Sequence, residues 1–183
     1  IDAGADAHAT LGSGFTSMFF AVRAGHIDVA LNLLEAGVDV NALLEAKKNV
    51  GNRGANNATF QPIGDGMSPL LMAVRNGHFE LAIELVKAGA DVNDERTGFT
   101  PLHTMSWVRK PDESDRGDPA PVGSGNVSSL DFVRTLVALG ADVNWRLAEG
   151  ARRQPNSASR IRSGGTTPLL LAADRADAAL LRP

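Results

Sequence analysis

The chain contains no cysteine and no long hydrophobic run. Without cysteine, neither a disulfide nor a thiolate site can form within these 183 residues, although the redox compartment stays open. No apolar run approaches the roughly 18 residues of a membrane span, and the opening residues lack the basic and apolar regions of a signal peptide. With 43% hydrophobic and 21% charged residues, the composition is typical of soluble proteins and indicates neither disorder nor membrane insertion.

What the chain does contain is internal repetition. A segment with a leading glycine, a Ser or Thr two positions later and an apolar run occurs four times, beginning at Gly14, Gly66, Gly98 and Gly165. A closing segment Gly-x-Asp-Val-Asn follows the first three, ending at Asn41, Asn93 and Asn144. From leading Gly to closing Asn there are 27 positions in the first two units and 46 in the third. The third unit therefore carries 19 extra residues.

Within each unit the spacing predicts a helix, a turn and a second helix. A Ser or Thr hydroxyl can cap the first helix, and a proline at the next position loses no backbone donor there. The capping residues are Thr16, Ser68, Thr100 and Thr167. The second helices show apolar residues at three- and four-residue spacing, as in Phe79, Ala82, Leu85 and Val86. Gly25 and Gly77 end the first helices. Gly37, Gly89 and Gly140 fall just past the second helices, where a left-handed residue suits the C-terminal cap.

The segment Thr100-Pro-Leu-His103, the pairs Gly25-His26 and Gly77-His78, and the Ala-Asp-Val-Asn closing resemble the ankyrin repeat. The resemblance covers almost the whole chain. It implies an all-α solenoid of stacked helix-turn-helix units with β-hairpin-like fingers and a concave surface that binds proteins. The chain departs from the family pattern at Ser17, at Phe19 and at Arg175-Ala-Asp177. The segment from Trp107 to Pro111 is similar to one in bacterial members, which implies a bacterial source.

We expect a single ankyrin-repeat domain over residues 1–183, with about three full repeats and partial terminal ones. Its parts are a partial repeat 1–13, a repeat 14–41 with insertion 42–65, a repeat 66–97, a repeat 98–144 with internal insertion 109–127 and finger insertion 145–164, and a partial repeat 165–183. Both ends resemble pieces of a longer array. Leu169, Leu180 and Leu181 are therefore expected to be partly unshielded, or covered by further repeats or another chain.

The insertions differ in charge from the repeats. Residues 145–164 carry a net charge of +4, whereas the repeat framework without its three insertions carries −7. This basic finger could steer an anionic partner. The favoured alternative is that its arginines pair with framework carboxylates or keep a loop soluble. Nucleic acid is disfavoured, because the arginines are not interleaved with aromatic residues and the isoelectric point is about 5.8.

Enzymatic, metal and cofactor chemistry finds no support in the sequence. The resemblance gives His26 and His78 a place in the helix turn, and implies that the His103 ring bonds the backbone of a neighbouring repeat. The acidic loop 107–125 does not supply the alternating ligands of a calcium loop, and Gly123-Ser-Gly125 is too weak for a phosphate loop. We expect no catalytic residue, no cofactor and no metal.

Partner contacts are expected where the resemblance leaves groove-side positions free to vary. These are Phe15, Arg23, Met67, Arg75, Asn76, Phe99, Trp107 and Val108, with Arg152 and Arg153 from the basic finger. The alternative is that the fingers bury Phe15, Phe99 and Trp107 in a satellite core. A protein-binding scaffold is the leading functional hypothesis. An architectural or self-associating segment is second, and a regulatory domain for an enzyme outside this chain is third.

Overall fold

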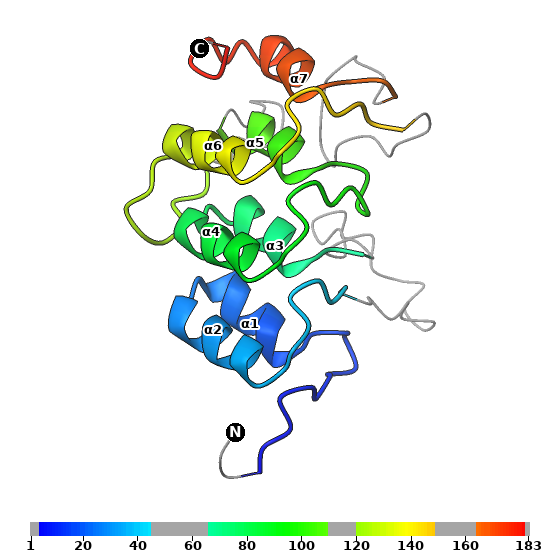
Figure 1. Cartoon of the computed structure of the whole chain (residues 1–183), viewed down its shortest axis with the longest axis vertical. Coiled ribbons are helices and arrows are strands. Elements are labelled where there is room, and N and C mark those ends of the chain that lie inside the picture. Colours follow the sequence, from blue (N-terminus) through cyan, green and yellow to red (C-terminus); the bar gives the residue numbers. More distant parts are fainter. Residues whose placement is uncertain (1–3, 45–65, 110–119, 149–163, 182–183) are drawn as a thin grey trace, which may run out of the picture.

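The structure is a computed structural model, and it describes residues 4–44, 66–109, 120–148 and 164–181. These ranges contain seven α-helices and no β-strand. The helices are α1 (Ser17–Ala24), α2 (Ile27–Glu35), α3 (Pro69–Arg75), α4 (Phe79–Lys87), α5 (Pro101–Arg109), α6 (Ser129–Ala138) and α7 (Pro168–Asp174). Figure 1 shows helix pairs stacked along one axis, with the two chain ends at opposite ends of the stack. The predicted all-α repeat solenoid is confirmed.

The stack has two helix layers with the core between them. The first helices α1, α3, α5 and α7 pack on one another in order, and the second helices α2, α4 and α6 form the other layer. Apolar residues from both layers are buried, such as Phe19 on α1 and Leu81 on α4. The rings of Phe79 and Phe132 stack between successive units, with centroids 4.7 Å apart. Each unit therefore completes its core on its neighbour.

The expected capping residues begin the first helices. The Thr16, Ser68, Thr100 and Thr167 hydroxyls accept hydrogen bonds from backbone N–H groups three residues on, at 3.5, 3.3, 3.3 and 3.3 Å. At the other end of α1, Gly25 adopts a left-handed φ of 75°, as its cap position requires. A Cβ there would also lie 2.6 Å from the His78 ring, so glycine is needed for space as well.

The closing asparagines join successive units. The Asn41 side chain donates to the Gly89 carbonyl at 3.0 Å and accepts from the Asp91 N–H at 2.9 Å. Asn93 makes the same pair of bonds to Gly140 and Asp142, at 3.0 and 2.9 Å. Backbone hydrogen bonds also join the two ends of two inter-unit connections, as in a β-hairpin. Leu44 bonds to Met67 and Gly66, and Leu147 bonds to Thr166 and Gly165. The asparagine bonds explain why the closing asparagine recurs in successive units.

His103 is fully buried between the third and fourth units. Its Nε2–H donates to the Thr166 carbonyl at 3.1 Å, because a carbonyl can only accept. Its Nδ1 then accepts from the Thr100 hydroxyl at 2.7 Å in the neutral ring. The expected bond from this ring to a neighbouring repeat's backbone is confirmed.

The end of the third unit's internal insertion, residues 120–127, lies on the opposite side of the stack from the inter-unit connections (Figure 1). Ser124 Oγ lies 2.9 Å from His78 Nδ1, and the Asn126 N–H donates to Glu80 Oε1 at 2.7 Å. The Ser124 hydroxyl also lies 3.4 Å from the Gly25 carbonyl. We call residues 121–126 the strap, because they join the third unit to the first two.

The fourth unit replaces the usual Gly-His turn with Ala176 and Asp177, and Ala176 adopts a positive φ of 51°. The buried Asp177 carboxylate accepts from Arg109 Nε and Nη2 at 2.7 and 3.1 Å. Arg109 also donates to the Ser129 hydroxyl. Leu169 and Leu181 are 58% and 40% exposed, and Leu180 is half-buried, which confirms that these leucines are partly unshielded.

Candidate functional site

A pocket of about 180 Å³ opens between the first two units, on helices α1 and α3. It is lined by Arg23, Met67, Met72, Arg75 and Asn76. Four of these five residues are sequence-predicted partner contacts, and the structure brings them together. Met67 and Met72 are almost fully buried and form its floor, whereas Arg23 and Arg75 are exposed at its rim.

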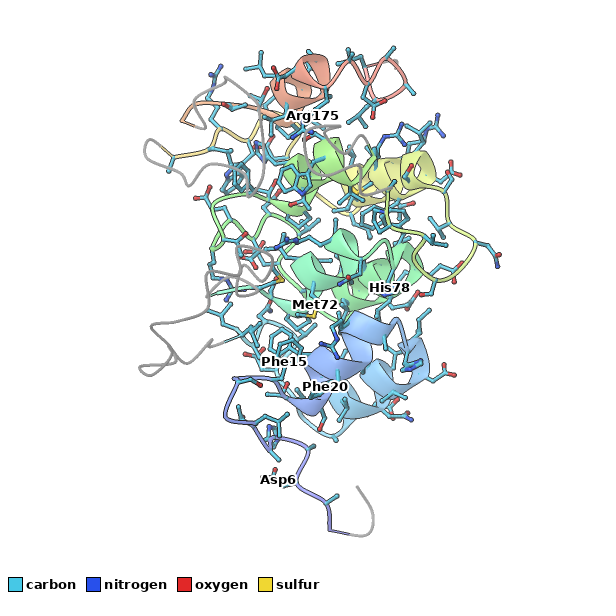
Figure 2. All side chains as sticks on the ribbon, turned by 180° about the vertical axis from the view of Figure 1, so that it is seen from behind. Asp6, Phe15, Phe20, Met72, His78 and Arg175 are labelled. Carbon is cyan, nitrogen blue, oxygen red and sulfur yellow. The ribbon has the colours of Figure 1, made fainter. Side chains whose placement is uncertain are left out.

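Arg23 is held at the rim by aromatic rings and by its backbone. Its guanidinium carbon lies 5.2 Å from the ring centroids of both Phe15 and Phe20, within the range of cation–π attraction. The two rings pack on each other with centroids 5.2 Å apart, and Figure 2 shows them side by side. The Arg23 carbonyl accepts from His78 Nε2–H at 3.0 Å, which ties the end of α1 to the next unit.

Arg75 ends α3 and carries its charge without a carboxylate partner among the described residues. Although part of its side chain is exposed, surrounding protein atoms desolvate it and lower the pKa of its guanidinium. An arginine keeps its charge at neutral pH despite such a shift. Asn76 caps the helix through a bond from its side-chain amide to the Met72 carbonyl, at 2.8 Å. The rim therefore presents donors that can bind an acceptor.

Other predicted contacts lie away from the surface. Phe99 is 4% exposed and Val108 is 5% exposed, so neither side chain is free to meet a partner. The Phe99 ring packs edge-on against Trp107, with centroids 5.1 Å apart, while Trp107 remains half-exposed. Phe99 and Trp107 thus pack on each other, whereas Phe15 packs separately beside Arg23, and the fingers of the satellite-core alternative lie largely outside the described residues. Arg152 and Arg153 lie outside the described residues.

Sequence reasoning missed two residues of this site, Phe20 and Met72. Phe20 is 42% exposed beside Arg23, and Met72 closes the pocket floor. Phe20 follows Phe19, which is fully buried, and two adjacent aromatics in a helix point in directions about 100° apart. That angular difference was the available signal for an exposed ring.

In the part of the chain that the structure describes, no three His, Asp or Glu side chains gather as a metal site would require. The helices that the structure describes are all too short or too polar to span a bilayer.

Comparison with known families identifies the family of this chain. A family model for the ankyrin repeat matches residues 13–43, and a model for ankyrin repeats in three copies matches residues 42–109. The two matches together span residues 13–109, more than half of the chain. The chain belongs to the ankyrin-repeat family. No curated protein matches it significantly. Ankyrin repeats are in general protein-interaction modules and typically non-catalytic, which implies that this ankyrin-repeat chain has protein partners.

The positions of Arg23 and Arg75 within their repeats explain how the pocket rim forms. Arg23, Arg75 and Trp107 each stand nine positions after the opening glycine of their unit. Because successive ankyrin units stack in the same orientation, equivalent positions form a row along the first-helix layer. In the first two units this row is cationic, and in the third it is aromatic.

Proposed function

We propose that this ankyrin-repeat chain is a non-catalytic scaffold that binds a partner protein along the row of first helices, with the extended fingers adding contacts. The observation that carries the proposal is the pocket between α1 and α3, whose two rim arginines have no carboxylate partner among the described residues. A surface with unpaired arginines beside an exposed aromatic ring has the residue types that are enriched at interfaces.

The layer of second helices lacks these features. Lys87 on α4 and Arg134 on α6 are each paired with an acid three residues away, Lys87 with Glu84 at 2.8 Å and Arg134 with Asp131 at 2.9 Å. Because each of these cations already has an acidic neighbour, it gains less from pairing with an acidic group of a partner. The difference between the two layers favours the first-helix row as the binding face.

The test compares proteins captured from a native extract by three immobilised chains. One is the natural chain, one, the row variant, carries Arg75→Ala and Trp107→Ala in the row and Phe20→Ala beside it, and one carries the matched changes Lys87→Ala and Arg134→Ala on the second-helix layer. Circular dichroism checks that all three keep their helices. We expect a stoichiometric partner that the control retains and the row variant loses by at least tenfold, since interface anchors each contribute about 1–2 kcal/mol or more.

A partner captured equally by all three chains would contradict the proposal, because the binding face would then lie elsewhere. Capture of nothing but further copies of the chain would favour the self-associating alternative instead.

A further inference from the structure

The arginines of the described residues fall into two groups. One group has polar partners: Arg96 with Asp94, Arg109 with Asp177, Arg134 with Asp131, Arg146 with the Gly165 carbonyl, and Arg175. The other group consists of Arg23 and Arg75, whose guanidinium groups make no hydrogen bond or ion pair to any described residue. Both members of this second group line the same pocket.

The pocket has the size of a side-chain site. Its volume of about 180 Å³ is below the roughly 300 Å³ at which pockets for small-molecule ligands begin. Met67 and Met72 close its base but are only 3% and 1% exposed, so the accessible part is the rim, which carries the two guanidinium groups and the Asn76 amide. An occupant that suits this rim has an anionic tip.

We propose that this pocket binds the carboxylate of a single Glu or Asp side chain of the partner protein. The inference rests on the proposed function and specifies the partner's chemistry. The carboxylate accepts hydrogen bonds from Arg23 and Arg75. Bonds between guanidinium and carboxylate groups are about twice as strong as those between neutral groups.

The charge of the molecule favours a single carboxylate over a polyanion. The repeat framework carries a net charge of −7, so a nucleic acid laid along it would meet repulsion outside this pocket. Two arginines can also contact only a few phosphates, whereas nucleic-acid binding depends on a longer run of phosphate contacts. The pocket is thus a local cationic point on an acidic body, which suits one acidic side chain among neutral neighbours.

The experiment follows the arginine Nε–Hε signals of the full chain by NMR at low salt during titration with defined peptides. The probe is the blocked pentapeptide Ala-Leu-Glu-Leu-Ala, and the controls carry Gln or phosphoserine in place of Glu. A duplex DNA of twenty base pairs is the polyanion control. The signals are assigned with Arg23→Gln and Arg75→Gln, and the paired Arg134 serves as an internal reference.

We expect the Arg23 and Arg75 signals to shift saturably with the Glu peptide, at least tenfold more than with the Gln peptide, while Arg134 stays unchanged. Equal shifts with Glu and Gln, or an Arg134 shift as large as the other two, would overturn the inference. Tighter binding of the phosphoserine peptide or of DNA would overturn it in favour of a phosphate site.

A second measurement separates this inference from the proposed function. The partner captured by the natural chain is tested against Arg23→Gln with Arg75→Gln, which removes both charges and keeps hydrogen-bonding side chains. We expect about tenfold weaker binding for this variant. If the row variant with three alanines loses the partner but the double glutamine variant retains it fully, the scaffold function stands and the carboxylate site is wrong.

Discussion

His103 makes the stability of this chain depend on pH. Burial lowers the pKa of its imidazole below the ordinary value, and this effect outweighs the bond to the Thr166 carbonyl and the charge of Glu95, which raise it. In the folded chain the ring therefore stays neutral as the pH falls through about 6.5, while in the unfolded chain the same residue takes up a proton. Because the unfolded state then binds more protons, stability is lost as the pH falls below about 6.5.

The expected loss from this residue is at most about 1.4 kcal/mol per pH unit, over the range from about 6.5 down to the lowered pKa. Urea unfolding at several pH values between 7.5 and 5.5 measures it, with His103→Gln as the comparison. The variant is less stable at every pH, since it loses a buried bond, but its dependence on pH in this range is weaker. Equal slopes for the two chains would show that His103 does not cause the effect.

At the scale of the element, the Arg109 and Asp177 pair fixes the fourth unit to α5. The side chains are only 10% and 1% exposed, and the carboxylate accepts two bonds from the guanidinium. Asp177→Asn leaves the Arg109 charge buried without its partner, so we expect destabilisation by about 3 kcal/mol or more. The matched change Asp131→Asn lies in an exposed site, where the carboxylate pairs with Arg134 and accepts from the Ser128 hydroxyl, and there we expect a much smaller loss.

Hydrogen exchange locates the Asp177→Asn effect. We expect faster exchange for the amides of α7 than for those of α3, because α7 is tied to the stack through α5 and this ion pair. An unchanged unfolding midpoint for Asp177→Asn would mean that the pair contributes nothing to holding the fourth unit.

Prediction from the sequence succeeded where the determining contacts are local or recur from unit to unit. The caps at Thr16 and Ser68 depend on residues three positions away, and the same pattern recurs in each repeat. Burial of Phe99 could not be predicted from its position, because the equivalent Phe15 stays half-exposed, and the Trp107 ring that packs on Phe99 stands where the first unit has Arg23. The bond between Arg109 and Asp177 joins residues 68 positions apart, a separation that no local pattern encodes.

At the scale of the whole molecule, the strap makes the first three units interdependent. Units of a repeat stack ordinarily contact only their nearest neighbours, so each interface contributes separately to stability. Here Ser124 from the third unit reaches both His78 in the second and the Gly25 carbonyl in the first. Loss of the strap contacts should therefore weaken the coupling of three units at once.

Gly123→Ala tests this coupling. Gly123 has a φ of +62°, and a Cβ there would overlap the carbonyl oxygen of Gly77, so the strap must move away from the α3–α4 turn. Gly37→Ala is the matched control, because Gly37 also has a positive φ, +89°, but has open space around it. Both variants bear the left-handed backbone penalty of about 1–2 kcal/mol, and only Gly123→Ala adds a steric term of about 1–3 kcal/mol.

The decisive readout is cooperativity rather than stability alone. If the strap couples the units, Gly123→Ala unfolds in urea with a shallower slope or in separate steps, because the first two units and the third no longer unfold together. Gly37→Ala shifts the midpoint and keeps the natural slope. A Gly123→Ala chain that matches Gly37→Ala in both midpoint and slope would mean that the stack is held by nearest-neighbour contacts alone, with the strap only resting on its surface.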